Sequence, residues 1–432
     1  MKSLWWQGVK MPSFPTFKGK KRADVLIIGG GLCGLTCAYL LKQKGVDSIV
    51  LEADRIGGGT TGNTTGKITL LHGLIYHKLL QKEGREPAQM YLQANLAALE
   101  QYKRLAQNID CDFEEKSAYT YSLDDPAAME CEAAALQALG MQAHFSPCPD
   151  LPFDPVGAVR VDGQAQFHPL KFLAQIAKDL CVYEHSPVRD VAPYRVTLDE
   201  GVITAKRIIV ATHFPILNKH GSYFLKLYQH RSYVLALENA PAVSGMYVDA
   251  ASGGLSFRDY GNLLLLGGGG HRTGKRGGGW QDLARFAARY YPHAHVRYRW
   301  AAQDCMSLDG ISYVGLYSRK TPNLYVASGF NKWGMTGSMA AAMTLCDLVS
   351  ETPNDLAKLF DPCRSMVKPQ LFVNGAETAL HLLRPTAPRC THLGCALSWN
   401  KAEHSWDCAC HGSRFSSDGK LLEPPATRDL KK

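Results

Sequence analysis

One stretch near the start of the chain constrains the fold more than any other, because it joins two apolar runs through a glycine turn and a helix. Residues 24–28 form a mostly apolar run that predicts a parallel strand buried on both faces. Residues 35–44 predict a helix, which Gly45 ends, and residues 48–51 predict a second strand that finishes at Glu52. This order of elements indicates an α/β domain.

The turn at residues 29–34, Gly-Gly-Gly-Leu-Cys-Gly, has the spacing of a dinucleotide-binding motif. Gly29 permits the tight turn, Gly31 lets the backbone approach a pyrophosphate, and Gly34 allows close packing of the helix against the strand. The helix N-terminus then faces the phosphate charge, and the carboxylate of Glu52 can accept hydrogen bonds from ribose hydroxyls. The motif predicts a dinucleotide site and leaves open whether the ligand is FAD or NAD.

Three later segments bear on that choice. Residues 57–67 form a loop dense in glycine and threonine, which can wrap a pyrophosphate and ribityl chain with N–H and hydroxyl donors. Residues 207–212 predict another buried strand that ends in small residues. Residues 323–329 predict a strand that runs into residues 330–336, and a helix follows over 337–349.

With these segments in place, residues 24 to about 362 resemble the FAD-dependent oxidoreductases of the D-amino-acid oxidase or glycine oxidase superfamily. The resemblance implies an α/β fold, in which a doubly wound, Rossmann-type FAD-binding domain is interleaved with an antiparallel-sheet substrate domain. It also implies that the helix starting near Asn331 to Thr336 points at the flavin pyrimidine ring, and that Val188 holds the adenine. Together the motifs and the resemblance predict FAD contacts from Gly29, Gly31, Leu32, Cys33, Gly34, Glu52, Ala53, Thr60, Thr61, Thr65, Gly66, Lys67, Val188, Ala211, Thr212, Asn331, Lys332, Gly334, Met335 and Thr336.

No catalytic residue is assigned from the sequence, because oxidation of a neutral amine by flavin needs positioning more than a strong base. Family position places five side chains near the flavin face, and each is either functional or simply a wall of the pocket: Lys332, His72, Arg231, Tyr233 and His271. Lys332 is the best candidate, since a cation at a helix start favours reduced, anionic flavin.

Residues 269–275 have the glycine and lysine spacing of a phosphate-binding P-loop, but Arg276 occupies the place of the Ser or Thr that would hold magnesium. A nucleoside-triphosphate site is therefore not expected. Two interpretations stay open for this basic turn: it borders the flavin or an acidic substrate, or it is a solvated hairpin end.

Four of the 13 cysteines crowd into the tail, in the boxes Cys-Thr-His-Leu-Gly-Cys at 390–395 and Cys-Ala-Cys-His-Gly-Ser at 408–413. A structural zinc site normally offers Cys-x2-Cys pairs, which these spacings do not match. A Rieske-type [2Fe-2S] cluster needs two thiolates and two imidazoles. The boxes resemble the Rieske proteins of respiratory and photosynthetic cytochrome complexes, and this match implies that Cys390 and Cys408 bind one iron and His392 and His411 the other, with a disulfide between Cys395 and Cys410.

The tail departs from that pattern in three ways. Ala409 stands where a proline is usual, which loosens the loop. Phe415 stands where high-potential members carry a tyrosine, so that Ser413 alone donates to the cluster sulfurs. The loss of that donor should lower the reduction potential of the cluster. Little precedes the first box, and residues 370–383 predict a short helix in place of the usual strands. We expect a flavin unit at 1–362, a linker at 363–383 and a small all-β Rieske domain at 384–432, which leans on its neighbour for stability.

Composition excludes several other classes of protein. Of 432 residues 46% are apolar and 20% are charged, as in ordinary folded proteins, and the net charge of +9 forms no long basic run that would indicate nucleic-acid binding. No secretory leader is visible, and no uncharged apolar run approaches the roughly 18–20 residues that span a bilayer. We expect a cytoplasmic protein with no nucleic-acid partner and no membrane span.

The combined motifs predict a flavin-dependent dehydrogenase that oxidises a small-molecule substrate, an amine or amino acid, and passes electrons singly through the Rieske cluster to an external acceptor. Two alternatives share the same signature. One is an electron-transfer or redox-sensing protein without a metabolic substrate. The other is a reductase, in which an external donor feeds the cluster and the flavin reduces a substrate.

Overall fold

The structure, a computed structural model, describes residues 3–217, 220–385 and 388–430. Its first sheet is largely parallel, since β1 (Gly19–Ile28) pairs in parallel with the strands on both of its sides, and residues 25–28 of β1 are buried. Helix α1 (Leu32–Gln43) packs against both α5 (Pro169–Ala177) and α8 (Gly334–Val349). In spatial order the strands are β16 (Tyr313–Leu316), β17 (Leu324–Ser328), β10 (Gly201–Val210), β1 (Gly19–Ile28), β2 (Ser48–Leu51) and β7 (Cys181–Tyr183), with β9 (Arg195–Leu198) beside β10 and β8 (Val188–Ala192) beside β9.

The second sheet is antiparallel except where β12 meets β4. Its order is β15 (His295–Met306), β11 (Tyr228–Glu238), β14 (Leu263–Arg272), β13 (Ser256–Tyr260), β12 (Met246–Asp249), β4 (Glu114–Ser122), β6 (Gly157–Gln166) and β3 (Lys67–Ile68), with β5 (His144–Ser146) beside β6. The helices that accompany it are α2 (Ile75–Lys82), α3 (Arg85–Ala106), α4 (Pro126–Ala138) and α7 (Gly279–Tyr290).

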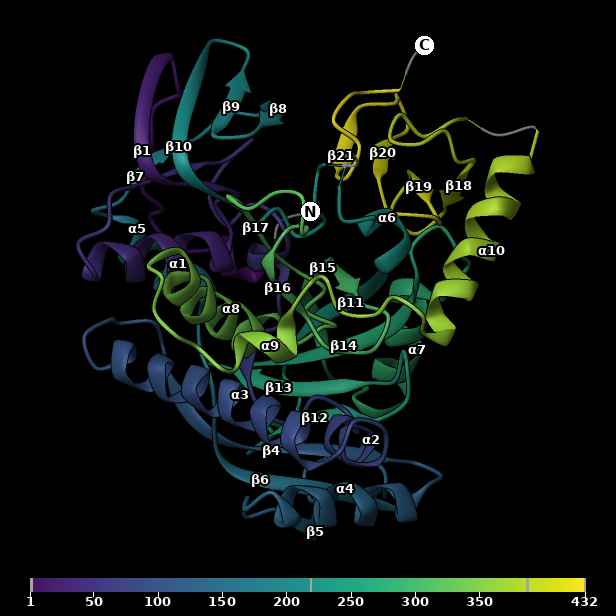
Figure 1. Ribbon diagram of the computed structural model, residues 1–432. Coiled ribbons are helices and arrows are strands. Elements are labelled where there is room, and N and C mark those ends of the chain that lie inside the picture. Colours follow the sequence, from purple (N-terminus) through teal and green to yellow (C-terminus); the bar gives the residue numbers. More distant parts are fainter. Residues whose placement is uncertain (1–2, 218–219, 386–387, 431–432) are drawn as a thin grey trace.

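The chain alternates between the two sheets, visiting the first at β1–β2, β7–β10 and β16–β17 and the second at β3–β6 and β11–β15. Figure 1 shows the two layers, with α3 and α8 side by side between them. This is the interleaved arrangement that the resemblance implied. Residues at or just after the carboxyl ends of β1, β2 and β10 line one cavity together with residues of β11, β14 and β15.

The C-terminal module contains a third sheet of four short antiparallel strands, β18 (Leu397–Asn400), β19 (Ser405–Cys408), β20 (Arg414–Ser416) and β21 (Leu421–Glu423). Its apolar interior is small and includes Leu397, Phe415 and Ala426 together with cysteines. The helix α10 (Pro369–Leu383) precedes the module, as the sequence predicted for residues 370–383. Figure 1 shows the module seated beside the second sheet, with α10 along the outer edge of the molecule.

The remaining elements are short connections: α6 (Tyr223–Lys226), α9 (Ala357–Phe360) and the 3-10 turns Leu4–Trp6 and Thr60–Asn63. Helices α1 and α8 each begin three residues earlier than predicted, at Leu32 and Gly334. Within the described ranges, no helix has both the length and the apolar character needed to cross a bilayer.

Candidate functional site

A cavity of about 1080 Å³ lies where the two sheets of the large unit meet the C-terminal module. Its lining comes from the glycine turn after β1, the loop after β2, the loop between β17 and α8, strands β11, β14 and β15, and residues 421–424 of the module. Pockets for single small ligands usually measure about 300–1,000 Å³, so this central cavity has room for a dinucleotide and a small molecule beside it.

The glycine turn after β1 leaves a bare backbone at the edge of the central cavity. Gly29 has a φ of +116°, and a Cβ there would lie 2.5 Å from the carbonyl oxygen of Ala211. A Cβ on Gly34 would lie 2.0 Å from the carbonyl oxygen of Gly29. Both positions therefore exclude a side chain, and Gly31 presents its backbone to the cavity. This cradle fits the pyrophosphate of a dinucleotide.

Glu52 lies at the end of β2, where the ribose of a dinucleotide is expected. Its Oε2 accepts a hydrogen bond of 2.7 Å from the backbone N–H of Gly30, and its Oε1 accepts one of 2.9 Å from Asp54. Burial raises the pKa of this carboxyl group, and the two backbone donors oppose that effect. The side chain also lines the central cavity, so it is held in place to accept further hydrogen bonds there.

The structure brings all but three of the twenty predicted FAD residues to the central cavity. The three that do not line it have structural positions nearby. Gly34 packs under the turn, Gly66 is held against the carbonyl of Phe167, and the Thr336 hydroxyl donates to the carbonyl oxygen of Thr69. The residues that line it are Gly29, Gly31, Leu32, Cys33, Glu52, Ala53, Thr60, Thr61, Thr65, Lys67, Val188, Ala211, Thr212, Asn331, Lys332, Gly334 and Met335.

Two lysines put positive charge into the central cavity. Lys332 precedes α8 in a left-handed conformation with φ of +73°, and burial lowers its pKa while the carboxylate of Asp304 opposes that shift. Burial and the nearby guanidinium of Arg258 lower the pKa of Lys67 to about 7. The Nζ of Lys67 donates to the hydroxyls of Thr65 and Ser256, each at 3.3 Å. Among the described residues no carboxylate forms an ion pair with Lys67.

His72 forms part of the cavity lining and is held from behind. Its ring nitrogens hydrogen-bond to the Tyr91 hydroxyl at 2.6 Å and to the carbonyl oxygen of Thr69 at 2.8 Å, and the ring stacks on Trp333. Burial lowers its pKa to about 3, so the ring is neutral at ordinary pH. His72 therefore acts as a fixed, uncharged part of the lining.

Tyr233 also lines the central cavity, whereas His271 does not. The Tyr233 hydroxyl and the His271 Nε2 lie 3.0 Å apart. Of these two candidates for the flavin face, Tyr233 therefore lies in the lining, and His271 contacts it from outside the lining.

Arg231 lies elsewhere than the sequence suggested. Instead of facing the central cavity it is buried at the boundary with the C-terminal module, where it donates to Glu403 at 2.7 Å and to Glu423 at 2.8 Å. Arg414 pairs with the same two carboxylates. The physical reason is charge pairing, since carboxylates compensate the cost of burying a guanidinium and the module supplies two of them. Arg231 fastens the module to β11.

The basic turn at residues 269–275 supports the same contact. Gly267, Gly268 and Gly270 line the cavity, but the tip of the turn lies on the module. A Cβ on Gly274 would lie 2.5 Å from the backbone nitrogen of Ala409, and Arg272 donates to the Ala409 carbonyl oxygen at 3.2 Å. The tip is therefore a docking contact, which neither open interpretation of this turn included.

The two Cys/His boxes come together in the module. The Cys390 and Cys408 side chains are buried in the same small cluster, and the rings of His392 and His411 meet edge to face with centroids 4.8 Å apart. His411 is 1% exposed, and neither of its buried ring nitrogens has a hydrogen-bond partner in the part of the chain that the structure describes. Two buried thiols and two adjacent imidazoles, with both ring nitrogens of His411 buried and without a partner among the described residues, fit a Rieske-type cluster.

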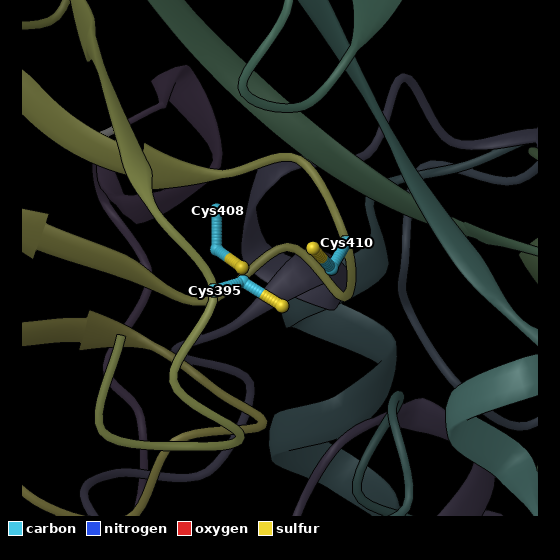
Figure 2. A group of neighbouring side chains, drawn as sticks. All are labelled: Cys395, Cys408 and Cys410. Carbon is cyan, nitrogen blue, oxygen red and sulfur yellow. The ribbon is translucent and has the colours of Figure 1, made fainter. Parts of the chain in front are cut away.

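The sulfurs of Cys395, Cys408 and Cys410 lie within 4.8 Å of one another (Figure 2). Cys408 is an expected iron ligand, and the other two are the expected disulfide partners. All described cysteines carry free thiols in this structure, so the disulfide stays a prediction.

One contact that joins the two sites was not predicted from the sequence. Phe214 is fully buried, and its ring centroid lies 6.3 Å from that of His392 and 6.2 Å from that of His411. It lies two positions beyond Thr212, which follows β10 and lines the central cavity together with Ala211 and His213. An aromatic residue two positions beyond a predicted cofactor contact was the only available signal.

Comparison with known proteins agrees with both sites. Residues 24–348 match the family described as FAD dependent oxidoreductase, and residues 370–432 match the Rieske [2Fe-2S] domain. The chain belongs to the FAD-dependent oxidoreductases and carries a C-terminal Rieske domain. It binds FAD and a [2Fe-2S] cluster.

A relative of this oxidoreductase, the Rieske 2Fe-2S iron-sulfur protein YhfW of Bacillus subtilis (strain 168), is 31% identical over 494 aligned residues, covering 99% of this chain and 97% of YhfW. Among solved structures, glycine oxidase from Geobacillus kaustophilus superposes with a TM-score of 0.67 at 20% identity, covering 80% of this chain and 99% of that one. L-proline dehydrogenase from P. horikoshii gives 0.68 at 15% identity, with 80% and 98% covered. These two structures show the fold of the flavin unit.

Proposed function

We propose that this oxidoreductase is a dehydrogenase that oxidises an amino acid or related amine at FAD and passes the electrons singly through the [2Fe-2S] cluster to an external acceptor. One observation carries the proposal. The segment after β10 lines the central cavity at Ala211 and Thr212, and then places the Phe214 ring against the rings of His392 and His411. A single short segment thus contacts the FAD cavity and the cluster site.

A second connection runs through Gln303 on β15, which is 3% exposed and lines the central cavity. Its backbone carbonyl oxygen accepts from the Thr60 hydroxyl in the predicted FAD loop. Its side-chain Nε2 donates 2.9 Å to the carbonyl oxygen of Gly412, next to His411. The side-chain Oε1 accepts from Thr273. Gln303 therefore fixes the second cluster loop relative to the flavin cavity.

The assignment of individual residues to the two groups belongs to this proposal. Cys390 and Cys408 hold one iron and His392 and His411 hold the other, while the cavity residues predicted from the sequence hold FAD. Bound FAD supplies two-electron oxidation, and the cluster accepts electrons one at a time. Lys332 and the N-terminus of α8 line the cavity, and their positive potential would stabilise the negative charge of reduced flavin if the pyrimidine ring lies beside them, as the resemblance implies.

The substrate class rests on two lines of support. The similar structures include an enzyme of glycine and an enzyme of L-proline. The central cavity also holds the Lys67 ammonium, whose only polar contacts in the described chain are hydroxyls. A substrate carboxylate would supply a counter-charge for this ammonium. The residues of the cavity therefore favour an amine that carries a carboxylate over one that does not.

Anaerobic titration of the purified holoprotein tests the proposal. A panel of amino acids and amines is added without oxygen, while the flavin and the cluster are followed by absorbance and the cluster by electron paramagnetic resonance. The proposal expects one class of compound to bleach the flavin and then reduce the cluster. Bleaching of the flavin alone would refute the internal transfer. Failure of every compound to bleach the flavin, with rapid reduction by an electron-carrier protein, would favour an electron-transfer protein.

A further inference from the structure

Helix α10 is amphipathic, but its polar face is turned toward the protein and its apolar face toward solvent, the reverse of an ordinary surface helix. Its buried residues are polar, Asn374 at 2% and His381 at 9% exposure. Its outer face, defined here as Phe372, Val373, Leu380 and Leu383, is apolar, and these side chains are 69%, 50%, 65% and 80% exposed. Helical spacing puts them in one continuous stripe. Contiguous exposed apolar surface of this kind marks an interaction site.

The outer face cannot turn inward, because polar contacts fix the opposite face of α10. Asn374 accepts from Arg272 at 3.1 Å and donates to the carbonyl oxygen of Leu225 at 3.2 Å. Glu377 pairs with Lys275 at 2.6 Å, and the His381 ring hydrogen-bonds to the carbonyl oxygen of Ala396. The apolar stripe is therefore held outward, along the edge of the molecule that Figure 1 shows.

Charge around the outer face selects the partner. Lys368, Arg384 and Arg389 flank the stripe. Lys368 pairs with Glu83 at 2.9 Å, whereas Arg384 and Arg389 form no ion pair with a carboxylate of the described residues. The one acid among residues 368–389 is Glu377, which is paired on the inner side. A second copy of the chain would bring Arg384 and Arg389 against a stripe flanked by the same cations, and no unpaired carboxylate lies among residues 368–389 to compensate them. The stripe is also a convex ridge on a single helix, a shape that inserts among lipid chains without needing a complementary groove. Both properties favour a negatively charged bilayer surface.

We infer that α10 docks this protein on an anionic membrane surface, with its outer face inserted at the headgroup boundary and its basic ends near the lipid phosphates. The inference does not depend on the proposed function. The C-terminal end of α10 adjoins the first cluster loop. There the backbone carbonyl oxygen of His381 accepts from the backbone N–H of Ala396, and Arg389 donates to the carbonyl oxygen of Gly394. Docking therefore brings that loop to the membrane, where Leu393 is 40% exposed.

Flotation of the holoprotein with vesicles tests the inference. Vesicles of phosphatidylglycerol and phosphatidylcholine in about a 1:2 ratio should carry the protein, and vesicles of phosphatidylcholine alone should carry much less. Phe372→Asp with Leu380→Asp should reduce the bound fraction at least about tenfold, since charged groups replace the inserted side chains. Leu123→Asp is the matched control. Leu123 is an apolar side chain that is 54% exposed, and it is distant in sequence from α10, so this substitution should leave binding unchanged.

A second variant separates the contribution of charge. Arg384→Gln should weaken binding to anionic vesicles about fivefold, the effect of about 1 kcal/mol for one basic residue near such a surface, and added salt should weaken binding further. Absence of binding to anionic vesicles, or equal binding by the Phe372/Leu380 variant and the control, would overturn the inference. So would a dimer in analytical ultracentrifugation that the Phe372/Leu380 variant abolishes, because the stripe would then join two copies.

Discussion

The two cofactor sites of this oxidoreductase are built in opposite ways. The central cavity draws its lining from strands and loops spread between residues 28 and 427, and much of that lining is backbone or small side chains. The cluster site draws its expected donors from two short loops between residues 390 and 411. The first site therefore depends on the whole fold and little on any one side chain, whereas the second depends on single donor atoms. Substitutions should separate the two sites accordingly.

The largest expected effect is loss of one cofactor without the other. Cys408→Ser should abolish the [2Fe-2S] cluster, because a buried thiolate ligand is removed, and should leave FAD bound. Iron content and cluster absorbance of the purified variant measure the loss of the cluster, and its flavin content measures the retention of FAD. Cys148→Ser, at a buried thiol far along the chain from the boxes, is the control and should keep both cofactors. Simultaneous loss of FAD in the Cys408 variant would show that the sites are not independent.

A buried ionic network stabilises the boundary between the flavin unit and the module, and its disruption should have the next largest effect. Arg231→Met leaves Glu403 and Glu423 with Arg414 alone, and removal of one partner from a buried ionic network costs about 3 kcal/mol or more. In denaturant the cluster signal should disappear before the flavin signal.

Arg189→Met is the control for that experiment, since Arg189 pairs with Asp199 on the surface and should cost about 1 kcal/mol or less. If the cluster signal were lost at the same denaturant concentration in the two variants, Arg231 would not fasten the module.

A smaller effect is expected at the contact between the sites. Phe214→Leu keeps an apolar side chain but removes the ring that touches both histidines, and should slow electron transfer to the cluster about tenfold, the equivalent of about 1.4 kcal/mol in activation free energy. Phe286→Leu, in another part of the core, is the control. The cluster's resonance spectrum should persist in both variants. Equal rates in the two would place the transfer path elsewhere.

The smallest effect concerns Lys67 and pH. Burial lowers the pKa of Lys67 to about 7, so its ammonium is present below that pH and is lost as the pH rises through it. If the ammonium binds a substrate carboxylate, KM should rise several-fold between about pH 6 and pH 8, with kcat changing less. Lys67→Arg should flatten this part of the profile, because a guanidinium stays charged. A pH profile identical in the two forms would contradict the role.

The sequence predicted what local chemistry determines. The glycine turn could be predicted because Gly29 and Gly34 lie where the backbone excludes any side chain. The Cys/His boxes could be predicted because coordination of the cluster requires two thiolates and two imidazoles. The interleaved fold came from the resemblance, and the structure confirms it.

The sequence could not predict contacts between distant segments. Arg231 and Glu403 are 172 positions apart, and nothing near Arg231 shows that the outer side of β11 receives the module. For the same reason the tip of the turn at 269–275 had no visible partner, and Phe214 had no visible role. The reversed polarity of α10 also follows from what its neighbours offer, because Arg272 and Lys275 draw Asn374 and Glu377 inward.

Transfer between the two sites is tested most directly by stopped-flow kinetics without oxygen. Substrate identified by titration is mixed with the holoprotein at several protein concentrations, and flavin bleaching and cluster reduction are recorded together. Transfer within one chain predicts that the cluster is reduced after the flavin, at a rate independent of protein concentration. A cluster that stays oxidised while the flavin is bleached, or a rate that rises in proportion to protein concentration, would contradict it.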